Sequence, residues 1–497
     1  MRSFFSAIRS HLALVIVFFA LLFRLPLLNG SFWLDEAAQA LESQRPFFQQ
    51  LQIVDDFQPP LLHYVVHFSM YVGTAEWWLR TVGALIPGLV TVWFTYKIGE
   101  ALWDKRTGLF AALLLSTSTF HIFYSQELRQ YSLPAAFATV SWFVLIKSWR
   151  SNQTASLAQL STFTIFTILG LYSSYLFPFV VIAQVVFVWS FLRKHLMNWL
   201  VVLTLAGLSF APILPLFFAQ LNAGSTLRIE LPGWEDVVSF PQIKVLPLVM
   251  AKFIFGVSNV EISFPFIAVS VVIAGCLALI YKQQATKLFS PQMRVVFIWL
   301  AIPIFSAFLI SYVVPVLQPK RVLYCLPGFY LLVAGTTTNL KKLRITQPAV
   351  LLISLLLLIN VVGIYHYWSD PRLQREQWRE LIQEIETKYP TQSAALFAFP
   401  EPFAPWIWYA NPSYPTFTTG SVLANSNQQL TEDLKKINEY NHVLVFEYLT
   451  DLTDPDNLLH SNLKSFGYEE QGYFMYPNIG RVWMYSKPAA VISYIHE

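Results

Sequence analysis

The sequence predicts a polytopic α-helical membrane protein with an extracytoplasmic α/β domain at its C-terminus. Three observations lead to this prediction. The 497 residues are 55% hydrophobic but only 12% charged, about half the charged fraction of soluble domains. Apolar segments long enough to span a bilayer recur up to about residue 370. Beyond that point they stop, and strand-like and helix-like segments take their place.

The first hydrophobic segment starts near Leu12, after Arg2 and Arg9. It lacks the small-residue cleavage site of a signal peptide, so we expect an uncleaved anchor helix that ends at about residue 29. Further segments of suitable length bring the total to about eleven spanning helices. Those after the first are expected at 81–102, 109–124, 131–149, 157–174, 176–192, 199–219, 263–281, 295–315, 322–338 and 347–367.

The basic residues of the loops indicate the orientation in the membrane. They fall on alternate loops, on the same side as Arg2 and Arg9. They are Lys105, Arg106, Lys147, Arg150, Arg193, Lys194, Lys282, Lys287, Arg294, Lys341, Lys342 and Arg344. The positive-inside rule then places the N-terminus in the cytoplasm and, with an odd number of spans, the C-terminus outside. Membrane lipids are the expected surroundings, and we expect no nucleic-acid partner.

Two domains are expected. Residues 1–370 form the transmembrane domain, whose first extracytoplasmic loop covers 30–80, and residues 371–497 form the α/β domain. In the latter we expect strands at Ala394–Phe399, Val443–Tyr448 and Arg481–Ser486, and helices at Trp378–Tyr389 and Leu430–Tyr440. The two cysteines, Cys276 and Cys325, lie in apolar segments and support neither a disulfide framework nor a cysteine metal site.

Asp35 and Glu36 are the first candidate functional residues, because they follow the first hydrophobic segment directly. Carboxylates at a membrane boundary are costly to keep and indicate function by default. Desolvation by apolar neighbours makes a carboxylate a better proton acceptor, which suits a general base. Alternatively, Asp35 caps a helix over residues 36–41. The two roles are compatible, so both acids are kept as candidate catalytic residues.

Other polar residues of the first loop favour a structural role. Asp55 and Asp56 stand before a Pro-Pro pair and predict a turn, although paired acids near Gln58 and His63 also suit a divalent cation. His63 and His67 are four residues apart on a predicted helix, but no third ligand is apparent. We therefore predict no metal site and leave a divalent cation open as a cofactor.

Two groups of charged residues on the outer side suit an anionic ligand. Glu127 and Arg129 are the charges of the segment 121–131, where they either close a helix hairpin as an ion pair or bind a ligand. Arginine is a natural partner for phosphate because of its fork of donors. Lys320 and Arg321 run against the charge bias of the outer loops, and act either as lipid anchors or as a phosphate site.

Carboxylates and cations on the same side of the membrane suit glycosyl transfer from a lipid-phosphate sugar. The phosphate is a good leaving group, so cations stabilise its charge and no general acid is required. One base activates the acceptor hydroxyl, and a single displacement inverts the anomeric centre. Arg24 and Arg80 lie at outer helix ends and are candidates for the same pocket.

Several motifs resemble those of the GT-C membrane glycosyltransferases. The branch is the one that includes protein O-mannosyltransferases, the lipid A aminoarabinose transferase and bacterial relatives that decorate lipopolysaccharide cores. Residues 31–37 (SFWLDEA) are similar to its first-loop acidic motif, and residues 59–64 (PPLLHY) to its Pro-Pro-Leu-Tyr-Tyr element. Residues 124–133 (YSQELRQYSL) give the most specific match. Segments 170–175, 320–327 and 376–380 are also similar, and the likeness covers about residues 12–380.

The resemblance implies roles for individual residues. Asp35 would be the catalytic base with Glu36 in support, while Arg129, Lys320 and Arg321 would hold a polyprenyl phosphate. The remaining residues expected to bind substrate are Glu127, Tyr131, His63 and Arg80. Relatives often have histidine at the positions of Gln58 and Ser174, and these departures remove two candidate ligands or acids.

The resulting hypothesis is an inverting glycosyltransferase of a bacterial-type cytoplasmic membrane. It would move a sugar from a polyprenyl-phosphate carrier to a glycan, lipid or protein acceptor on the extracytoplasmic face. A transporter or flippase for lipid-linked sugars is the main alternative, and a non-catalytic assembly protein is a third. Transporters usually contain internal repeats and helices broken at mid-membrane. This chain has no evident repeat, and its charges gather at one face, which favours the enzyme.

Overall fold

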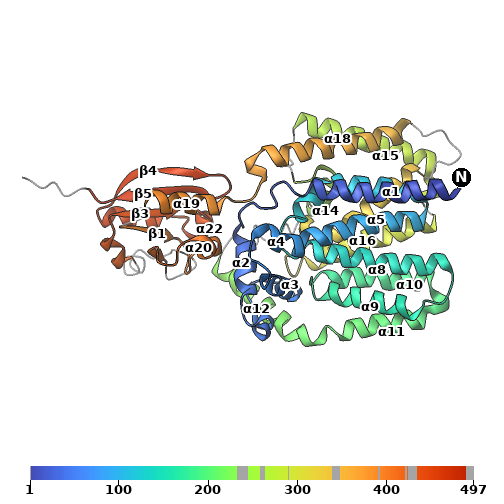
Figure 1. Cartoon of the computed structure of the whole chain (residues 1–497), viewed down its shortest axis with the longest axis horizontal. Helices are drawn as coiled ribbons and strands as arrows, with labels where there is room; N and C mark the ends of the chain where they lie inside the picture. The colour runs from blue at the N-terminus through green and yellow to red at the C-terminus, as the bar shows by residue number, and fades with distance from the viewer. Residues whose placement is uncertain are drawn as a thin grey trace, which may run out of the picture. The chain divides into compact units, whose positions relative to one another are not determined.

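The structure, a computed structural model, describes residues 2–231, 244–257, 263–288, 290–338, 347–389, 392–419, 423 and 434–488. The chain divides into two compact units (Figure 1). Unit 1 consists of Met1–Asn29, Glu42–Leu221 and Val238–Gln374. Unit 2 consists of Gly30–Leu41, Asn222–Val237 and Arg375–Glu497. Two helices contain a boundary between the units: α2 (Leu34–Ser43) between residues 41 and 42, and α12 (Leu214–Glu230) between residues 221 and 222.

Unit 1 is built from helices, several of which lie side by side in Figure 1. They are α1 (Arg2–Leu22), α3 (Leu61–Met70), α4 (Glu76–Arg80), α5 (Ile86–Leu102), α6 (Lys105–Thr117), α7 (Thr119–Tyr124), α8 (Ser132–Ser151), α9 (Leu157–Leu171), α10 (Phe177–Phe191), α11 (Leu196–Leu208), α12 (Leu214–Glu230), α14 (Val245–Phe255), α15 (Phe264–Leu288), α16 (Pro291–Ile310), α17 (Leu326–Thr338) and α18 (Gln347–Ser369). Short 3₁₀ helices lie at Phe47–Gln52 and Pro319–Cys325.

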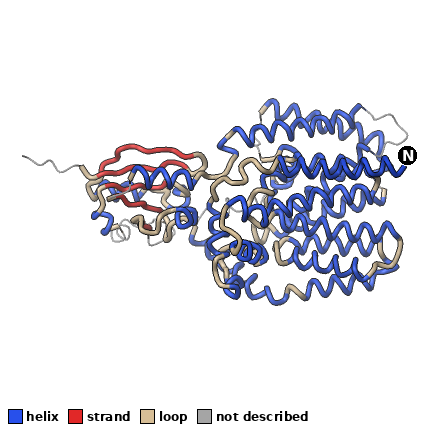
Figure 2. The backbone as a smooth tube through the Cα atoms, in the orientation of Figure 1, coloured by secondary structure: helices blue, strands red, loops and turns tan. Residues whose placement is uncertain are grey.

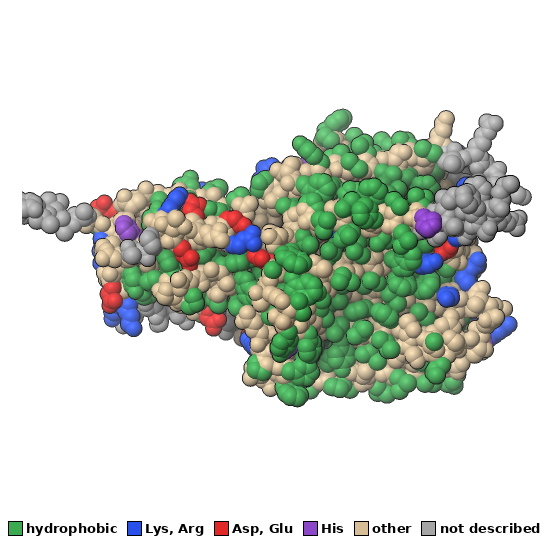
Figure 3. Space-filling model, in the orientation of Figure 1, with side chains coloured by type: hydrophobic (Ala, Val, Ile, Leu, Met, Phe, Trp, Pro, Cys, Tyr) green, Lys and Arg blue, Asp and Glu red, His purple; other side chains and the backbone are tan. Residues whose placement is uncertain are grey.

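The core of unit 1 is aromatic and closely packed. The indoles of Trp142 and Trp299 stack with their ring centroids 5.3 Å apart, and both are fully buried. Helices α5 and α6 approach each other at Gly99 and Gly108, where a Cβ atom on Gly99 would lie 2.5 Å from the Cα atom of Gly108. Figure 3 shows hydrophobic side chains over much of the visible surface of the helical unit, as expected for a surface in contact with lipid.

Within the described residues, four helical segments are long and apolar enough to cross a membrane: Glu76–Leu102, Arg193–Leu227, Pro291–Ile310 and Gln347–Ser369. Shorter apolar helices include His11–Leu22, Leu157–Leu171, Phe177–Phe191, Val245–Phe255 and Phe264–Ile280. The mostly helical architecture with a small C-terminal sheet domain is therefore confirmed. The total of about eleven spans remains a prediction.

Three expected helices differ in detail from the structure. The first ends at Leu22 rather than near residue 29. The segment expected at 109–124 is divided at Ser118, which has an extended backbone and accepts a hydrogen bond from the backbone of His121, so that a second helix begins. The segment expected at 199–219 is interrupted between α11 and α12 by a 3₁₀ turn that contains Pro212. Proline cannot continue the hydrogen-bond ladder of a helix, which accounts for the break.

Unit 2 contains a five-stranded mixed sheet (Figure 2). Its strands are β1 (Ser393–Phe397), β2 (Thr416–Thr418), β3 (His442–Phe446), β4 (Glu469–Tyr476) and β5 (Gly480–Ser486), in the order β2-β1-β3-β5-β4. β1 is parallel to β2 and β3, whereas β5 is antiparallel to β3 and β4. Besides the parts of α2 and α12 that belong to it, this unit contains the helices α19 (Trp378–Lys388), α20 (Ala404–Tyr409), α22 (Thr450–Thr453) and α23 (Leu458–Ser465).

Both faces of the central strands are buried. Phe397 and Phe446 face α19, where Phe446 stacks on Trp378 with centroids 5.9 Å apart. Leu396 and Val445 alternate to the opposite face and pack with Leu459 of α23. Burial on both sides explains the continuous apolar sequences of β1 and β3. The expected strands agree with β1, β3 and β5. The helix expected at Leu430–Tyr440 is a 3₁₀ turn at Lys435–Glu439, and residues 430–433 lie outside the described residues.

Candidate active site

Asp35 and Glu36 stand in the first turn of α2. The helix begins at Leu34, so Asp35 is an interior residue of the first turn and not the N-cap that the alternative interpretation required. Acidic side chains in this position are stabilised by the partial positive charge of the helix N-terminus. Glu36 is fully buried, and its Oε2 atom lies 3.7 Å from the Nε atom of Arg375. These contacts all lie within unit 2.

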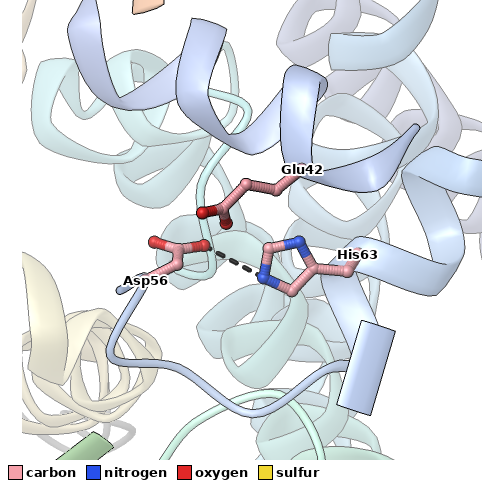
Figure 4. A group of neighbouring side chains, drawn as sticks. All are labelled: Glu42, Asp56 and His63. Carbon is pink, nitrogen blue, oxygen red and sulfur yellow. Dashed lines mark ion pairs between the residues drawn. The ribbon is translucent and has the colours of Figure 1, made fainter. Parts of the chain in front are cut away.

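A second group of charged side chains lies in unit 1 around Asp56. The Oδ1 atom of Asp56 is 2.7 Å from Nη1 of Arg129, and its Oδ2 atom is 3.0 Å from Nε2 of His63. The amide of Gln58 also donates to Oδ2 of Asp56. Figure 4 shows the carboxylate of Glu42 pointing toward the same place. The side chains of Asp56 and His63 are 8% and 1% exposed, so this is a buried polar cluster.

Different elements bring these side chains together. Asp56 lies in the loop before α3, His63 lies in the first turn of α3, and Arg129 lies between α7 and α8. The amide of Gln220 in α12 fixes the loop by donating to the carbonyls of Ile53 and Gln58, at 2.7 and 3.1 Å. The loop therefore folds inward and carries Asp56 into the unit instead of into solvent.

The charges around Glu42 and Asp56 shift their pKa values in opposite directions. Burial would raise the pKa of Asp56, but Arg129 and His63 outweigh it and lower the pKa below its ordinary value. Burial and the negative charge of Asp56 raise the pKa of Glu42 to about 8. Asp56 is therefore the ionised member of the cluster, and Glu42 holds a proton near neutral pH.

Glu42, Asp56 and His63 are also the residues of the described chain that could hold a metal ion together, since their ligand atoms lie within 4.8 Å of one another. The Oε2 atom of Glu42 is buried and has no hydrogen-bond partner among the described residues. His67 belongs to another arrangement, because its Nδ1 atom lies 2.8 Å from the carbonyl oxygen of Ser43. The sequence did not identify Glu42 as a companion of His63. The sequence feature that could have identified Glu42 is its position as a charged residue in a short polar helix next to apolar segments.

One of the expected phosphate ligands, Lys320, lies near the turn that carries Arg129. The ammonium of Lys320 lies 5.4 Å from the ring centroid of Tyr131, a cation–π contact. Arg321 donates from Nη1 to the carbonyl oxygen of Val316 at 3.1 Å. Lys320 and Arg321 are both in the 3₁₀ segment Pro319–Cys325, which precedes α17. The structure therefore brings Tyr131 and Lys320 together. It also brings Arg129 close to His63, because both contact the carboxylate of Asp56.

The remaining candidates are buried within unit 1. Arg80 is fully buried and donates to the carbonyl oxygen of Leu28 at 2.9 Å. Arg24 is also fully buried and donates from Nη1 to the carbonyl oxygens of Ala20 and Ser116, at 2.7 and 3.1 Å. Such contacts hold the end of α1 against its neighbours. Glu127 is 2% exposed and lies in the same turn as Arg129.

Comparisons with known proteins agree with the resemblance seen in the motifs. Residues 57–217 match the family model of the dolichyl-phosphate-mannose-protein mannosyltransferases. A search of curated proteins finds no match. Among solved structures, the chain is similar to ArnT from Cupriavidus metallidurans bound to undecaprenyl phosphate, with a TM-score of 0.57, 13% identity and 99% of each chain covered.

Two further structures give similar values. The apo form of ArnT from Cupriavidus metallidurans has a TM-score of 0.55, 12% identity and 98% of each chain covered. The apo oligosaccharyltransferase of Archaeoglobus fulgidus has a TM-score of 0.52 and 13% identity, with 97% of this chain and 75% of that chain covered. The chain shares the fold of these solved structures, and the resemblance predicted from the motifs is confirmed.

Proposed function

We propose that the protein is an inverting glycosyltransferase that uses a polyprenyl-phosphate sugar as donor. The acceptor is a glycan, lipid or protein on the extracytoplasmic face of the cytoplasmic membrane, with the N-terminus of the chain inside and the C-terminal unit outside. The observation that carries the proposal is the acidic pair Asp35-Glu36 in the first turn of α2, in a chain with the GT-C fold. The matched motif segment that contains Glu127 and Arg129 supports it.

In the proposed reaction, Asp35 accepts the proton of the acceptor hydroxyl as its oxygen attacks the anomeric carbon. The bond between that carbon and the phosphate oxygen breaks, and the polyprenyl phosphate leaves with one additional negative charge. Arg129, Lys320 and Arg321 stabilise this charge. A guanidinium has five N–H donors and can hold a carboxylate and a phosphate at the same time. Attack from the side opposite the phosphate inverts the configuration.

We also propose that Glu42, Asp56 and His63 hold a divalent cation. Two carboxylates and an imidazole form a donor set that suits Zn²⁺ or Mn²⁺. The 3.0 Å between Oδ2 of Asp56 and Nε2 of His63 is compatible with two adjacent ligands of one ion at about 2.1 Å each. A cation bound there would supply positive charge for phosphate oxygens.

Substitution of Asp35 tests the proposed function. In a strain that lacks the chain, expression of the wild type should restore a surface glycan that mass spectrometry detects, and Asp35→Asn should not. Binding of undecaprenyl phosphate to the purified protein should be the same in both, because the phosphate site is intact. A full glycan profile with Asp35→Asn would exclude Asp35 as the base. An unchanged glycan profile in the deletion strain, with altered export of lipid-linked sugars, would favour a transporter.

A further inference from the structure

Two consecutive residues of unit 2, Arg375 and Glu376, contact the first turn of α2. The backbone N–H of Leu34 donates to Oε2 of Glu376 at 3.1 Å. The Nε atom of Arg375 lies 3.7 Å from Oε2 of Glu36, with both side chains less than one tenth exposed. The residues on both sides of Asp35 are therefore held by the same dipeptide.

Glu376 is itself held firmly. Its Oε2 atom accepts a second hydrogen bond from Nε1 of Trp378 at 2.7 Å, and its Oε1 atom accepts one from the hydroxyl of Tyr448 at 2.8 Å. The rings of Trp378 and Tyr448 meet edge to face with centroids 5.2 Å apart. Because Trp378 is fully buried in the core of unit 2, this carboxylate has a fixed position relative to the sheet.

The segment before α2 is tied to the same unit. The hydroxyl of Ser31 donates to the carbonyl oxygen of Glu376 at 2.6 Å, and the N–H of Phe32 donates to the hydroxyl of Tyr409 at 2.7 Å. The ring of Phe32 packs edge to face on Trp408 with centroids 5.7 Å apart. The chain entering α2 thus has fixed backbone and side-chain contacts up to Leu34.

We propose that Arg375 and Glu376 are positioning residues that set the orientation of Asp35 through the first turn of α2. This inference rests on the proposed function of Asp35 as the base. The first N–H groups of a helix have no partner within the helix. Here an acidic side chain from a distant part of the sequence accepts one of them, and negative charge is favoured at that helix end. Both carboxylate oxygens of Glu376 accept hydrogen bonds from unit 2 or from α2, which fixes the orientation of this carboxylate relative to the first turn of the helix.

Orientation of a base matters because small displacements of reacting groups reduce the rate strongly. A shift of about 1 Å caused by a change away from the chemistry can reduce turnover about a hundredfold. Loss of the acceptor for Leu34 would loosen the turn that carries Asp35 while leaving its carboxylate present. The consequence should be a lower turnover rate with unchanged binding of the lipid phosphate.

The experiment compares Glu376→Ala with Glu376→Gln in the full-length protein. Glutamine can still accept from Leu34 and Trp378 with its oxygen and donate to the Tyr448 hydroxyl with its nitrogen. Membranes from the deletion strain contain unused donor and unmodified acceptor, so added purified protein gives an initial rate of glycan formation. We expect Glu376→Ala to reduce this rate about tenfold to a hundredfold. We expect Glu376→Gln to stay close to the wild type.

Hydrogen–deuterium exchange provides the structural measurement. Amides at the start of α2 should exchange faster in Glu376→Ala, whereas amides of β1 and β3 should keep their protection. Glu380→Gln is the matched control, because Glu380 pairs with Arg379 on the outer part of α19 and should leave both measurements unchanged. Arg375→Ala should act in the same direction as Glu376→Ala, and Arg375→Lys should partly restore the rate.

The outcomes separate this inference from the proposed function. If Asp35→Asn is inactive but Glu376→Ala transfers sugar at the wild-type rate, the positioning role is wrong and the base assignment stands. The positioning role would also be wrong if Glu376→Gln lowered the rate as much as Glu376→Ala. That result would mean that the charge of Glu376, and not the geometry of its hydrogen bonds, is required. If Asp35→Asn is fully active, the proposed function itself fails.

Discussion

The carboxylate of Asp56 and the guanidinium of Arg129 form a buried ion pair, with Oδ1 and Nη1 2.7 Å apart and the side chains 8% and 10% exposed. They come from two separate loops, the one before α3 and the one before α8. The pair joins the loop that precedes residues 59–64 to the segment 124–133 and fixes their relative position. Removal of one partner would leave the other as an uncompensated buried charge, which is costly.

Arg129→Ala should therefore reduce the free energy of unfolding by about 3–5 kcal/mol. Asp56→Asn should also destabilise the protein, because it removes the partner of Arg129. The double variant Asp56→Asn/Arg129→Ala should cost less than the sum of the two single changes, since it leaves no unpaired charge from this pair. Thermal unfolding midpoints in one detergent provide the measurement. Strictly additive costs would show that the two residues do not stabilise each other.

Lys320→Ala should weaken the binding of undecaprenyl phosphate. The contact of Lys320 with the ring of Tyr131 holds the ammonium in place, and such contacts contribute about 0.5–2 kcal/mol. Tyr131→Leu should therefore weaken binding about twofold to thirtyfold, while Tyr131→Phe, which keeps the ring, should bind normally. Titration of the purified protein with undecaprenyl phosphate measures these affinities.

Lys97→Ala is the control for this series, because Lys97 also lies near an aromatic ring, 5.6 Å from Trp93, but next to the expected cytoplasmic loop at Lys105. The affinity of Lys97→Ala for undecaprenyl phosphate should equal that of the wild type. Equal weakening by Lys97→Ala and Lys320→Ala would mean that net charge, and not a local phosphate site, governs binding.

The stability of unit 2 should depend on pH through Glu376. Burial raises the pKa of Glu376 from 4.5 to about 7, against the opposing effect of hydrogen bonds from Tyr448 and Trp378, and the negative charge of Asp35 adds to the increase. The folded state therefore binds the proton more tightly than the unfolded state. This tighter binding of the proton by Glu376 stabilises the folded state fully below pH 4.5, and the stabilisation is lost as the pH rises through about 7.

The difference in unfolding midpoint between the wild type and Glu376→Gln measures this contribution. As the pH rises from about 4.5 to about 7, the unfolding midpoint of the wild type should fall steadily relative to that of Glu376→Gln. Glu380→Gln should show a constant difference over the same range. A constant difference for Glu376→Gln would mean that the folded and unfolded states bind this proton equally well.

Most helices and the central strands could be predicted from the sequence, because each is governed by local pattern. Apolar length indicated the segment that became α18, and short apolar sequences next to turn residues indicated β1 and β3. The breaks at Ser118 and Pro212 were not predicted, although each has a local cause in a side-chain cap or a missing N–H donor. The length of an apolar segment alone does not indicate such breaks within it.

The candidate site was predicted only in part, because its contacts connect residues that are far apart in the chain. Arg129 was expected to meet either Glu127 or a ligand, and its ion pair with Asp56 depends on how the first loop folds. The same applies to Glu376, which a local motif suggested but whose hydrogen bond to Leu34 depends on the tertiary structure. Residue types near a membrane indicate that a charge is important, but not which partner it has.

The cluster of Glu42, Asp56 and His63 leads to a last prediction about metal binding. After treatment with a chelator, addition of Zn²⁺ or Mn²⁺ should raise the unfolding midpoint, because an ion bound only by the folded state stabilises it. His63→Ala and Glu42→Gln should each remove most of this shift. His67→Ala provides the matched control, since His67 lies one turn along the same helix and contacts the carbonyl oxygen of Ser43. If the metal-induced rise of the unfolding midpoint persists in His63→Ala, the ion binds elsewhere. If the wild type shows no rise, the three side chains form a hydrogen-bonded group that supports Arg129 and holds no metal.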